Sequence, residues 1–300
     1  MTAVLRARGL GKRYRRRWGQ AGWALADCTL DVPAGRVTGL VGPNGAGKTT
    51  LLSLAAGLLT PTAGTIEVCG GRPGSGRAQL ARVGFVAQDT PVYARLTVAE
   101  HLTLGTRLSL RWDPELAAGR IRRLGLPPDQ RAGNLSGGQR AQLALTLAIA
   151  RRPELLILDE PVASLDPLAR REFLRDLADA TAGQRLSVVH SSHLVADLEQ
   201  VCDYVVVLVA SRVQVAGEVT SLLGTHHWLT GPVGAAPPAG AQVISARPAG
   251  PETSWLVRSA RPVAEPGWNV SPVGLEDLVL AYMSRPAAGS VPRPALEVPR

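Results

Sequence analysis

The residues G-P-N-G-A-G-K-T-T at 42–50 have the types and the spacing needed to hold phosphate groups. A glycine, four further residues and Gly-Lys-Thr lie between an apolar run and a stretch of helical periodicity, which is the context this pattern requires. The glycines let backbone N–H groups surround phosphate oxygens, and the start of the helix adds its positive end. Lys48 is expected to reach the β- and γ-phosphates, and the Thr49 hydroxyl to ligate Mg²⁺. The segment predicts a site for a nucleoside triphosphate.

Two adjacent carboxylates, Asp159 and Glu160, follow the apolar run L-L-I-L at 155–158. In doubly wound sheets, ligands lie at this carboxyl end of the strands. We expect Asp159 to hold Mg²⁺, directly or through water, and Glu160 to act as the base for an attacking water. The alternative is a solvated acidic turn. It is less favoured because two buried carboxylates are costly unless they serve a cation.

A third motif, N-L-S-G-G-Q-R at 134–140, places two glycines at the start of a helix-like stretch. The start of a helix binds anions, and glycines allow the backbone to approach a ligand closely. The order of a P-loop, L-S-G-G-Q and an apolar strand ending in Asp-Glu resembles the ABC ATPases. This resemblance covers roughly residues 3–222.

Further residues match motifs of the same family. Gln88 in F-V-A-Q-D lies where the family has its Q-loop glutamine, S-L-D at 164–166 resembles its D-loop, and S-S-H at 191–193 resembles its switch histidine. Tyr14 in G-K-R-Y is similar to the aromatic residue that stacks on adenine.

The resemblance implies the following roles: ATP binding by Tyr14, Gly42, Asn44, Gly45, Ala46, Gly47, Lys48, Thr49 and Thr50, signature contacts by Leu135, Ser136, Gly137, Gly138 and Gln139, D-loop contacts by Ser164 and Asp166, catalysis by Gln88, Glu160 and His193, and metal binding by Thr49, Gln88 and Asp159.

In that family, two ATPase domains pack head to tail, and the signature of each closes over the ATP held by the other. The resemblance therefore implies a homodimer or heterodimer, because this chain has one P-loop and one signature.

Two of the residue assignments have an alternative. His190 ends an apolar run and has the pattern of a core histidine, so His193 is preferred as the γ-phosphate contact. Trp18 competes with Tyr14 for adenine.

The apolar runs, with helical stretches between them, predict an α/β layered fold, and the resemblance implies that it is a P-loop NTPase of the ABC type. Runs at 37–41, 83–87, 155–158, 186–190 and 204–209 fit parallel strands covered on both faces. Residues 91–134 read as helices without strands, and the helical subdomain is predicted to span about 91–150 within an ATPase domain of residues 1–223.

The C-terminal part has a different composition. Residues 231–240 read as a linker, and so do His226 and His227. Short strands are expected at 241–246, 254–259 and 268–270 and a helix at 274–283, which gives a small α+β appendage within 224–285. The Pro-rich segment 286–300 is predicted to be disordered.

Charge and cysteine content limit the functional classes. The net charge of +9 is carried by arginine, with Lys12 and Lys48 the only lysines, so we discount it as a sign of nucleic-acid binding and expect no such partner. The three cysteines, Cys28, Cys69 and Cys202, are expected to be free thiols in a reducing compartment. We find no signal peptide and no apolar run of membrane-spanning length.

The resemblance implies an ATPase subunit of an ABC transporter, using ATP and Mg²⁺ at the cytoplasmic face of the membrane and driving a separate integral-membrane permease. The segments S-S-H-L-V-A-D-L-E-Q-V-C-D, V-A-G-E-V-T-S-L-L and L-E-D-L-V-L-A-Y-M resemble the multidrug and antibiotic exporters. In the family, Gln88 also begins the segment that meets the permease, with the contact expected near residues 90–96.

The rival interpretation is a soluble ABC ATPase acting on nucleic acid or ribosomes. Such proteins carry a long coiled coil between P-loop and signature, or two ATPase domains in one chain. Neither feature is present in this sequence.

Overall fold

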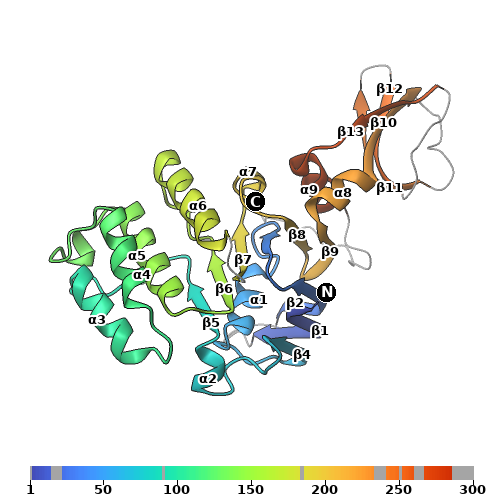
Figure 1. The fold of residues 1–300 in the computed structure, drawn as a ribbon. Helices are drawn as coiled ribbons and strands as arrows, with labels where there is room; N and C mark the ends of the chain where they lie inside the picture. The colour runs from blue at the N-terminus through green and yellow to red at the C-terminus, as the bar shows by residue number, and fades with distance from the viewer. Residues whose placement is uncertain are drawn as a thin grey trace, which may run out of the picture.

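Three β-sheets and a lobe of helices make up the described part of the chain, arranged from the helical lobe at one end to a small C-terminal sheet at the other (Figure 1). The structure is a computed structural model that describes residues 2–14, 22–89, 92–182, 186–232, 241–249, 252–259 and 267–285.

The central sheet has six strands in the order β5 (Val83–Val86), β6 (Leu155–Asp159), β7 (Ser187–Ser192), β3 (Val37–Val41), β8 (Tyr204–Val209) and β9 (Arg212–Glu218). The first five run parallel, and β9 pairs antiparallel with β8. Every predicted apolar run is therefore a strand of this sheet, which confirms the α/β fold. Since β3 and β6 both flank β7, the loops that follow them emerge at the same edge.

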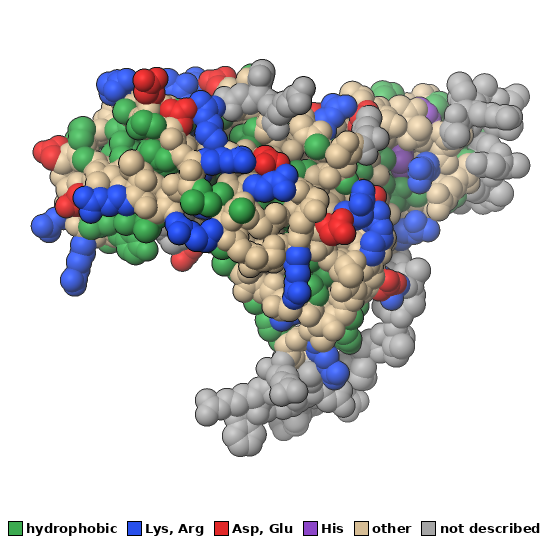
Figure 2. Space-filling model, turned by 60° about the horizontal axis from the view of Figure 1, so that its bottom comes forward, with side chains coloured by type: hydrophobic (Ala, Val, Ile, Leu, Met, Phe, Trp, Pro, Cys, Tyr) green, Lys and Arg blue, Asp and Glu red, His purple; other side chains and the backbone are tan. Residues whose placement is uncertain are grey.

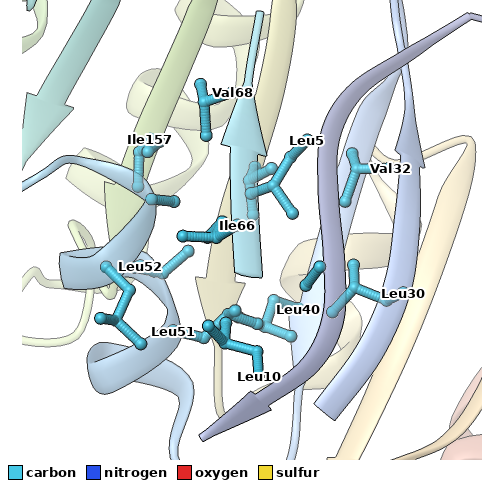
Figure 3. Packing of buried hydrophobic residues seen from close by; sticks show 14 of the residues in the cluster. Leu5, Leu10, Leu30, Val32, Leu40, Leu51, Leu52, Ile66, Val68 and Ile157 are labelled. Atoms are coloured by element: carbon cyan, nitrogen blue, oxygen red, sulfur yellow. The ribbon is translucent and has the colours of Figure 1, made fainter. Parts of the chain in front are cut away.

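A second sheet, absent from the sequence-based prediction, packs over this one. Its strands are antiparallel in the order β2 (Gly22–Pro33), β1 (Ala3–Tyr14) and β4 (Ala63–Val68). Side chains such as Leu5, Leu10 and Ile66 meet helix α1 (Lys48–Ala55) and Ile157 of the central sheet in one buried cluster (Figure 3). Each buried leucine or isoleucine contributes about 1.5–3 kcal/mol, so this cluster fixes α1 between the sheets.

The predicted helical insert is confirmed. Helix α2 (Arg77–Leu80) precedes β5 and is not part of the insert. The insert follows β5 and contains α3 (Val98–Leu108), α4 (Pro114–Arg123), a 3₁₀ turn (Ala132–Asn134) and α5 (Gly137–Ala150). Thr97 caps α3 in a capping box with Glu100, and Asp113 caps α4 ahead of a proline at its first position. The insert has its own apolar cluster, which includes Val98, Ile121 and Leu143.

The C-terminal part is a four-stranded antiparallel sheet ordered β11 (Gln242–Ala249), β12 (Glu252–Arg258), β10 (His226–Pro232) and β13 (Asn269–Pro272). Helix α9 (Leu275–Ser284) packs it against β8 and helix α7 (Val195–Glu199), and α8 (Val219–Thr225) joins it to β9. The three predicted strands and the predicted helix are confirmed as β11, β12, β13 and α9.

Two interpretations of this region are wrong. His226 and His227 begin strand β10 rather than a linker, and residues 231–232 complete that strand. The reason is tertiary contact: His226 is fully buried, its Nδ1 donates to the Leu222 carbonyl at 2.7 Å, and its Nε2 lies 2.9 Å from the Tyr282 hydroxyl. The rest of the predicted linker, 233–240, and the predicted disordered tail, 286–300, lie outside the described residues.

Cysteines and helix lengths agree with the sequence-based expectations. All three cysteines are free, and burial raises the pKa of the Cys28 thiol to about 12, which makes it unreactive. Across the ranges that the structure describes, each helix is too short or too polar to cross a bilayer. Helix α6 (Pro167–Thr181), the longest of those described, buries one face against α5 and the sheet.

His190 is a core histidine, as its position at the end of an apolar run predicts. It is fully buried, and neither ring nitrogen has a hydrogen-bond partner among the described residues. Burial lowers the pKa of His190 to about 4. In the unfolded chain this histidine takes up a proton near pH 6.5, whereas in the folded chain it stays neutral until about pH 4. The free energy of unfolding therefore decreases as the pH falls from about 6.5 toward 4.

Replacing His190 by Leu should remove this pH dependence, because the apolar side chain leaves no proton site and loses no hydrogen bond. Between pH 7 and pH 5 the wild type should lose about 2 kcal/mol more unfolding free energy than the variant. Urea titrations at the two pH values measure the difference. Equal losses in both proteins would contradict the assignment.

Candidate active site

The loop 42–47 joins β3 to the start of α1 and can be built only with glycine at two positions. A Cβ atom on Gly42 would lie 2.0 Å from the Leu208 carbonyl oxygen, and one on Gly47 would lie 2.5 Å from the Ala24 carbonyl oxygen. Gly47 also has a φ of 104°, which other residues rarely adopt. Helix α1 has no side-chain cap and no acidic residue in its first turn. Its first N–H groups therefore suit an anion, which fits the triphosphate predicted for this loop.

Lys48 brings a nearly buried positive charge to the start of this helix. Its side chain is 6% exposed, and its ammonium group donates to the Gly42 carbonyl at 2.8 Å. The same nitrogen lies 3.4 Å from Oε1 of Glu160. A buried ammonium needs such partners, and the anion-binding start of α1 lies beside it.

Glu160 lies between two basic side chains directly after β6. Its Oε1 faces Lys48, and its Oε2 lies 3.2 Å from Nδ1 of His193. Because an ionised carboxylate only accepts, Nδ1 of His193 carries the proton in this contact. Glu160 also has a φ of 45°, an unfavourable conformation for a residue with a side chain. Its backbone N–H donates to the Ser191 hydroxyl at 2.9 Å, which helps to hold the strained turn.

The predicted metal ligands share one pocket of about 770 Å³. Thr49, Gln88, Asp159 and Ser164 line it. Asp159 is 2% exposed and accepts a hydrogen bond from the Ser191 hydroxyl at 2.8 Å. Hydroxyl, amide and carboxylate oxygens are the donors that Mg²⁺ prefers, so the residues present fit this ion.

The signature residues form a separate site. Ser136 caps α5: its hydroxyl accepts from the Gln139 N–H at 3.2 Å, and the Gln139 side chain accepts from the Ser136 N–H at 2.9 Å. Leu135 is buried beneath this turn. A Cβ atom on Gly138 would lie 2.9 Å from Cβ of Ala169 in α6, so the second glycine is required by packing. In the described ranges, no hydrogen bond or ion pair joins the signature to the P-loop or to Glu160.

Two other predicted residues lie at the edges of the site. Tyr14 ends β1, is 43% exposed and has the Lys12 ammonium 5.7 Å from its ring centre. Its rival Trp18 lies outside the described residues. Asp166 caps α6 by accepting from the N–H groups of Leu168 and Ala169, so the D-loop aspartate also has a structural role.

Known proteins share sequence and fold with this chain. The sequence profile of the ABC transporter family matches residues 25–163. The chain is 36% identical over 204 residues to the uncharacterized ABC transporter ATP-binding protein YxlF of Bacillus subtilis (strain 168), covering 66% of this chain and 67% of that protein. It is 33% identical over 251 residues to the phosphonates import ATP-binding protein PhnC 1 of Rhodopseudomonas palustris (strain BisB18), covering 75% and 91%.

The chain belongs to the ABC transporter ATP-binding proteins. A solved ATP-binding subunit of an ABC transporter aligns with a TM-score of 0.63 and 28% identity, covering 73% of this chain and 91% of that one. The fold is that of an ABC ATPase, and the chain is an ATPase subunit that binds ATP.

Sequence reasoning missed the residues that support the ABC ATPase site from β7. Ser191 contacts both Asp159 and the Glu160 backbone. Ser192 donates to Asp197 of α7 at 3.1 Å and accepts from the Leu194 N–H, which fixes the turn that carries His193. The family motif S-S-H predicts a role only for its histidine. The two serines could have been found from their place at the end of β7, the strand that pairs with β6 and sets Ser191 opposite Asp159.

Replacing Lys48 by Ala should weaken ATP binding, because the phosphate charges lose a charge-assisted contact. The expected loss is about tenfold to a hundredfold in affinity, measured by calorimetry. Arg6→Ala is the matched control: it removes an equally positive side chain, 50% exposed on the outer sheet, and should leave affinity unchanged. Wild-type affinity in Lys48→Ala would refute the phosphate-binding assignment of this loop.

Proposed function

We propose that this subunit hydrolyses ATP at a composite site in a dimer and so drives a separate integral-membrane permease from the cytoplasmic face of the membrane. The observation that carries the proposal is the Glu160 carboxylate, held between Lys48 and His193 beside the pocket of Asp159. This arrangement puts a base, a phosphate-binding cation and a metal-binding carboxylate within a few side chains of one another.

The residues divide the chemistry among them. Lys48 would turn from Glu160 to the phosphates of ATP, and Glu160, released, would accept a proton from the attacking water. His193 would hold the far oxygen of that carboxylate and contact the γ-phosphate. Thr49, Gln88 and Asp159 would hold Mg²⁺, which when bound supplies positive charge to the phosphate oxygens. The neighbouring loop glycines would give the backbone N–H contacts.

The dimer is inferred from the lack of contact between the two half-sites within one chain. Ser136 and the first N–H groups of α5 form a helix start suited to an anion. Among the described residues, no hydrogen bond or ion pair joins this helix start to the P-loop of the same chain. With one P-loop and one signature in the sequence, both are used together only if two chains pack head to tail.

Tyr14 remains our proposal for the residue that contacts adenine.

The direction of transport is not part of the proposal. Likeness of the segments from residue 191 onward to exporters predicts export. PhnC 1, matched over 91% of its length, is named as an import protein, so this comparison does not support the export prediction. Both directions use the same ATPase chemistry, and the proposal depends on that chemistry alone.

The rival function on nucleic acid or ribosomes has less support. Figure 2 shows one face of the molecule, where Lys and Arg side chains are scattered among acidic and apolar ones and form no continuous stripe. Several arginines are already paired, such as Arg82 with Glu154 at 2.6 Å and Arg36 with Glu218 at 2.8 Å. A nucleic-acid site needs clustered cations free to neutralise phosphates.

Replacing Glu160 by Gln should leave ATP binding intact and slow hydrolysis by about 10²–10⁴-fold, because the base is lost while size and polarity are kept. ATP then acts as a ligand of the closed dimer and accumulates it. Size-exclusion chromatography should show a monomer without nucleotide or with ADP, and a dimer with Mg-ATP.

Glu172→Gln is the control, because Glu172 is an exposed carboxylate on α6. It should hydrolyse ATP at the wild-type rate and show little lasting dimer. If Glu160→Gln hydrolyses ATP as fast as this control, Glu160 is not the base. A Glu160→Gln protein that stays monomeric at saturating Mg-ATP would contradict dimer closure by nucleotide alone.

A further inference from the structure

The turn at Tyr93–Leu96 exposes an aromatic ring while its backbone is tightly held. The Tyr93 side chain is 65% exposed, and the Tyr93 carbonyl accepts from the Leu96 N–H at 2.9 Å. The next residue, Thr97, caps the start of α3 in a capping box with Glu100. The turn therefore presents its ring from a backbone anchored to the start of a helix.

His101 connects this turn to the helix by both of its ring nitrogens. Nδ1 lies 2.8 Å from the Thr97 carbonyl oxygen, and Nε2 lies 3.0 Å from the backbone N of Tyr93. A carbonyl only accepts and a backbone N–H only donates, so the imidazole is neutral with its proton on Nδ1. The ring is 3% exposed and lies 6.1 Å from the Tyr93 ring, at 29° to it.

The position of His101 is usually apolar. In a helix capped at Thr97, the residue before the cap, Leu96, and the fourth helical residue, His101, form the pair that normally makes an apolar staple. A histidine here, with both nitrogens bonded to backbone, fixes the turn by directed hydrogen bonds as well as by packing.

The same turn supports the chain that leads into the signature. The Leu96 carbonyl accepts from the Ala132 N–H, and the Ala94 carbonyl accepts from the Gly133 N–H, both at 2.9 Å. A Cβ atom on Gly133 would lie 3.0 Å from the Ala94 oxygen, so the two segments touch. Only Asn134 and Leu135 separate this contact from Ser136.

We propose that His101 is a positioning residue for the ATPase: it holds the Tyr93 turn against the 132–133 backbone, so that a permease segment contacting the exposed Tyr93 ring acts on Ser136. This rests on the proposed function, because it assumes that Ser136 completes the ATP site of a partner chain. Displacement of the turn should then alter turnover more than ATP binding, since the P-loop holds ATP within its own chain.

The test compares two replacements of His101 in the full chain. In His101→Gln, the side-chain oxygen reaches the place of Nε2 and can still accept from the Tyr93 N–H. In His101→Asn, the shorter amide can donate to the Thr97 carbonyl but cannot reach Tyr93. Thr103→Ala, which removes an exposed hydroxyl on the same helix, is the control. Hydrogen exchange by mass spectrometry and steady-state ATPase rates are measured on all four proteins.

We expect His101→Asn to speed exchange in both 92–97 and 131–136 by about fivefold to tenfold, with unchanged exchange in α1. Its kcat should fall by a similar factor and its KM for ATP should stay within about twofold. His101→Gln and Thr103→Ala should resemble the wild type.

Equal effects of Gln and Asn, or faster exchange confined to 92–97 with kcat unchanged, would overturn the proposal while leaving the ATPase assignment standing. Loosening of α1 in His101→Asn would mark a general folding defect and would also overturn it. A wild-type chain without ATPase activity would refute the proposed function instead, and the exchange of 131–136 would still decide whether His101 positions that segment.

Discussion

The ammonium group of Lys48 is a charge in a place nearly closed to water, and the site is arranged around the need to compensate it. A buried cation is costly unless polar atoms surround it. Here those atoms are the Gly42 carbonyl and the Glu160 carboxylate. The close approach of Gly42 and Gly47 to neighbouring backbone holds the loop in the shape that presents Lys48. The apolar cluster beneath α1 keeps the helix start, and with it the lysine, between two sheets.

The same constraint explains why Glu160 is strained and doubly paired. The carboxylate lies 3.4 Å from the Lys48 ammonium, whose charge it balances, and 3.2 Å from Nδ1 of His193. A positive φ right after β6 places it between the two side chains. Ser191 of the adjacent strand stabilises that backbone and also contacts Asp159, so one hydroxyl orients the predicted base and the predicted metal ligand.

Local sequence signals predicted the central strands, the helical insert and the places of the two loops that follow β3 and β6. The strands were predictable because runs such as L-L-I-L are buried on both faces, and the loop after β3 because its glycines have the fixed spacing that phosphate binding demands. The roles of the residues in these loops stay predictions. The outer antiparallel sheet was missed because its strands pair over long sequence distances, as Ala3 pairs with Pro33. His226 was misread because its partners Leu222 and Tyr282 meet only in the folded chain. The role of Ser191 could not be predicted because its contacts with Asp159 and the Glu160 backbone join residues about 30 positions apart in the sequence. The C-terminal sheet shares an apolar cluster with α7, the helix that follows the His193 turn. The sheet therefore packs against the element next to the candidate site.

In the proposed dimer, each ATP site combines the P-loop of one chain with the signature of another. The most direct measurement mixes Ser136→Arg protein with Lys48→Ala protein and follows ATP hydrolysis. In the heterodimer, both lesions fall on one composite site and the other site is intact, so two inactive proteins should regain activity together. Absence of any recovered activity, under conditions where labelled chains show that heterodimers form, would contradict the account.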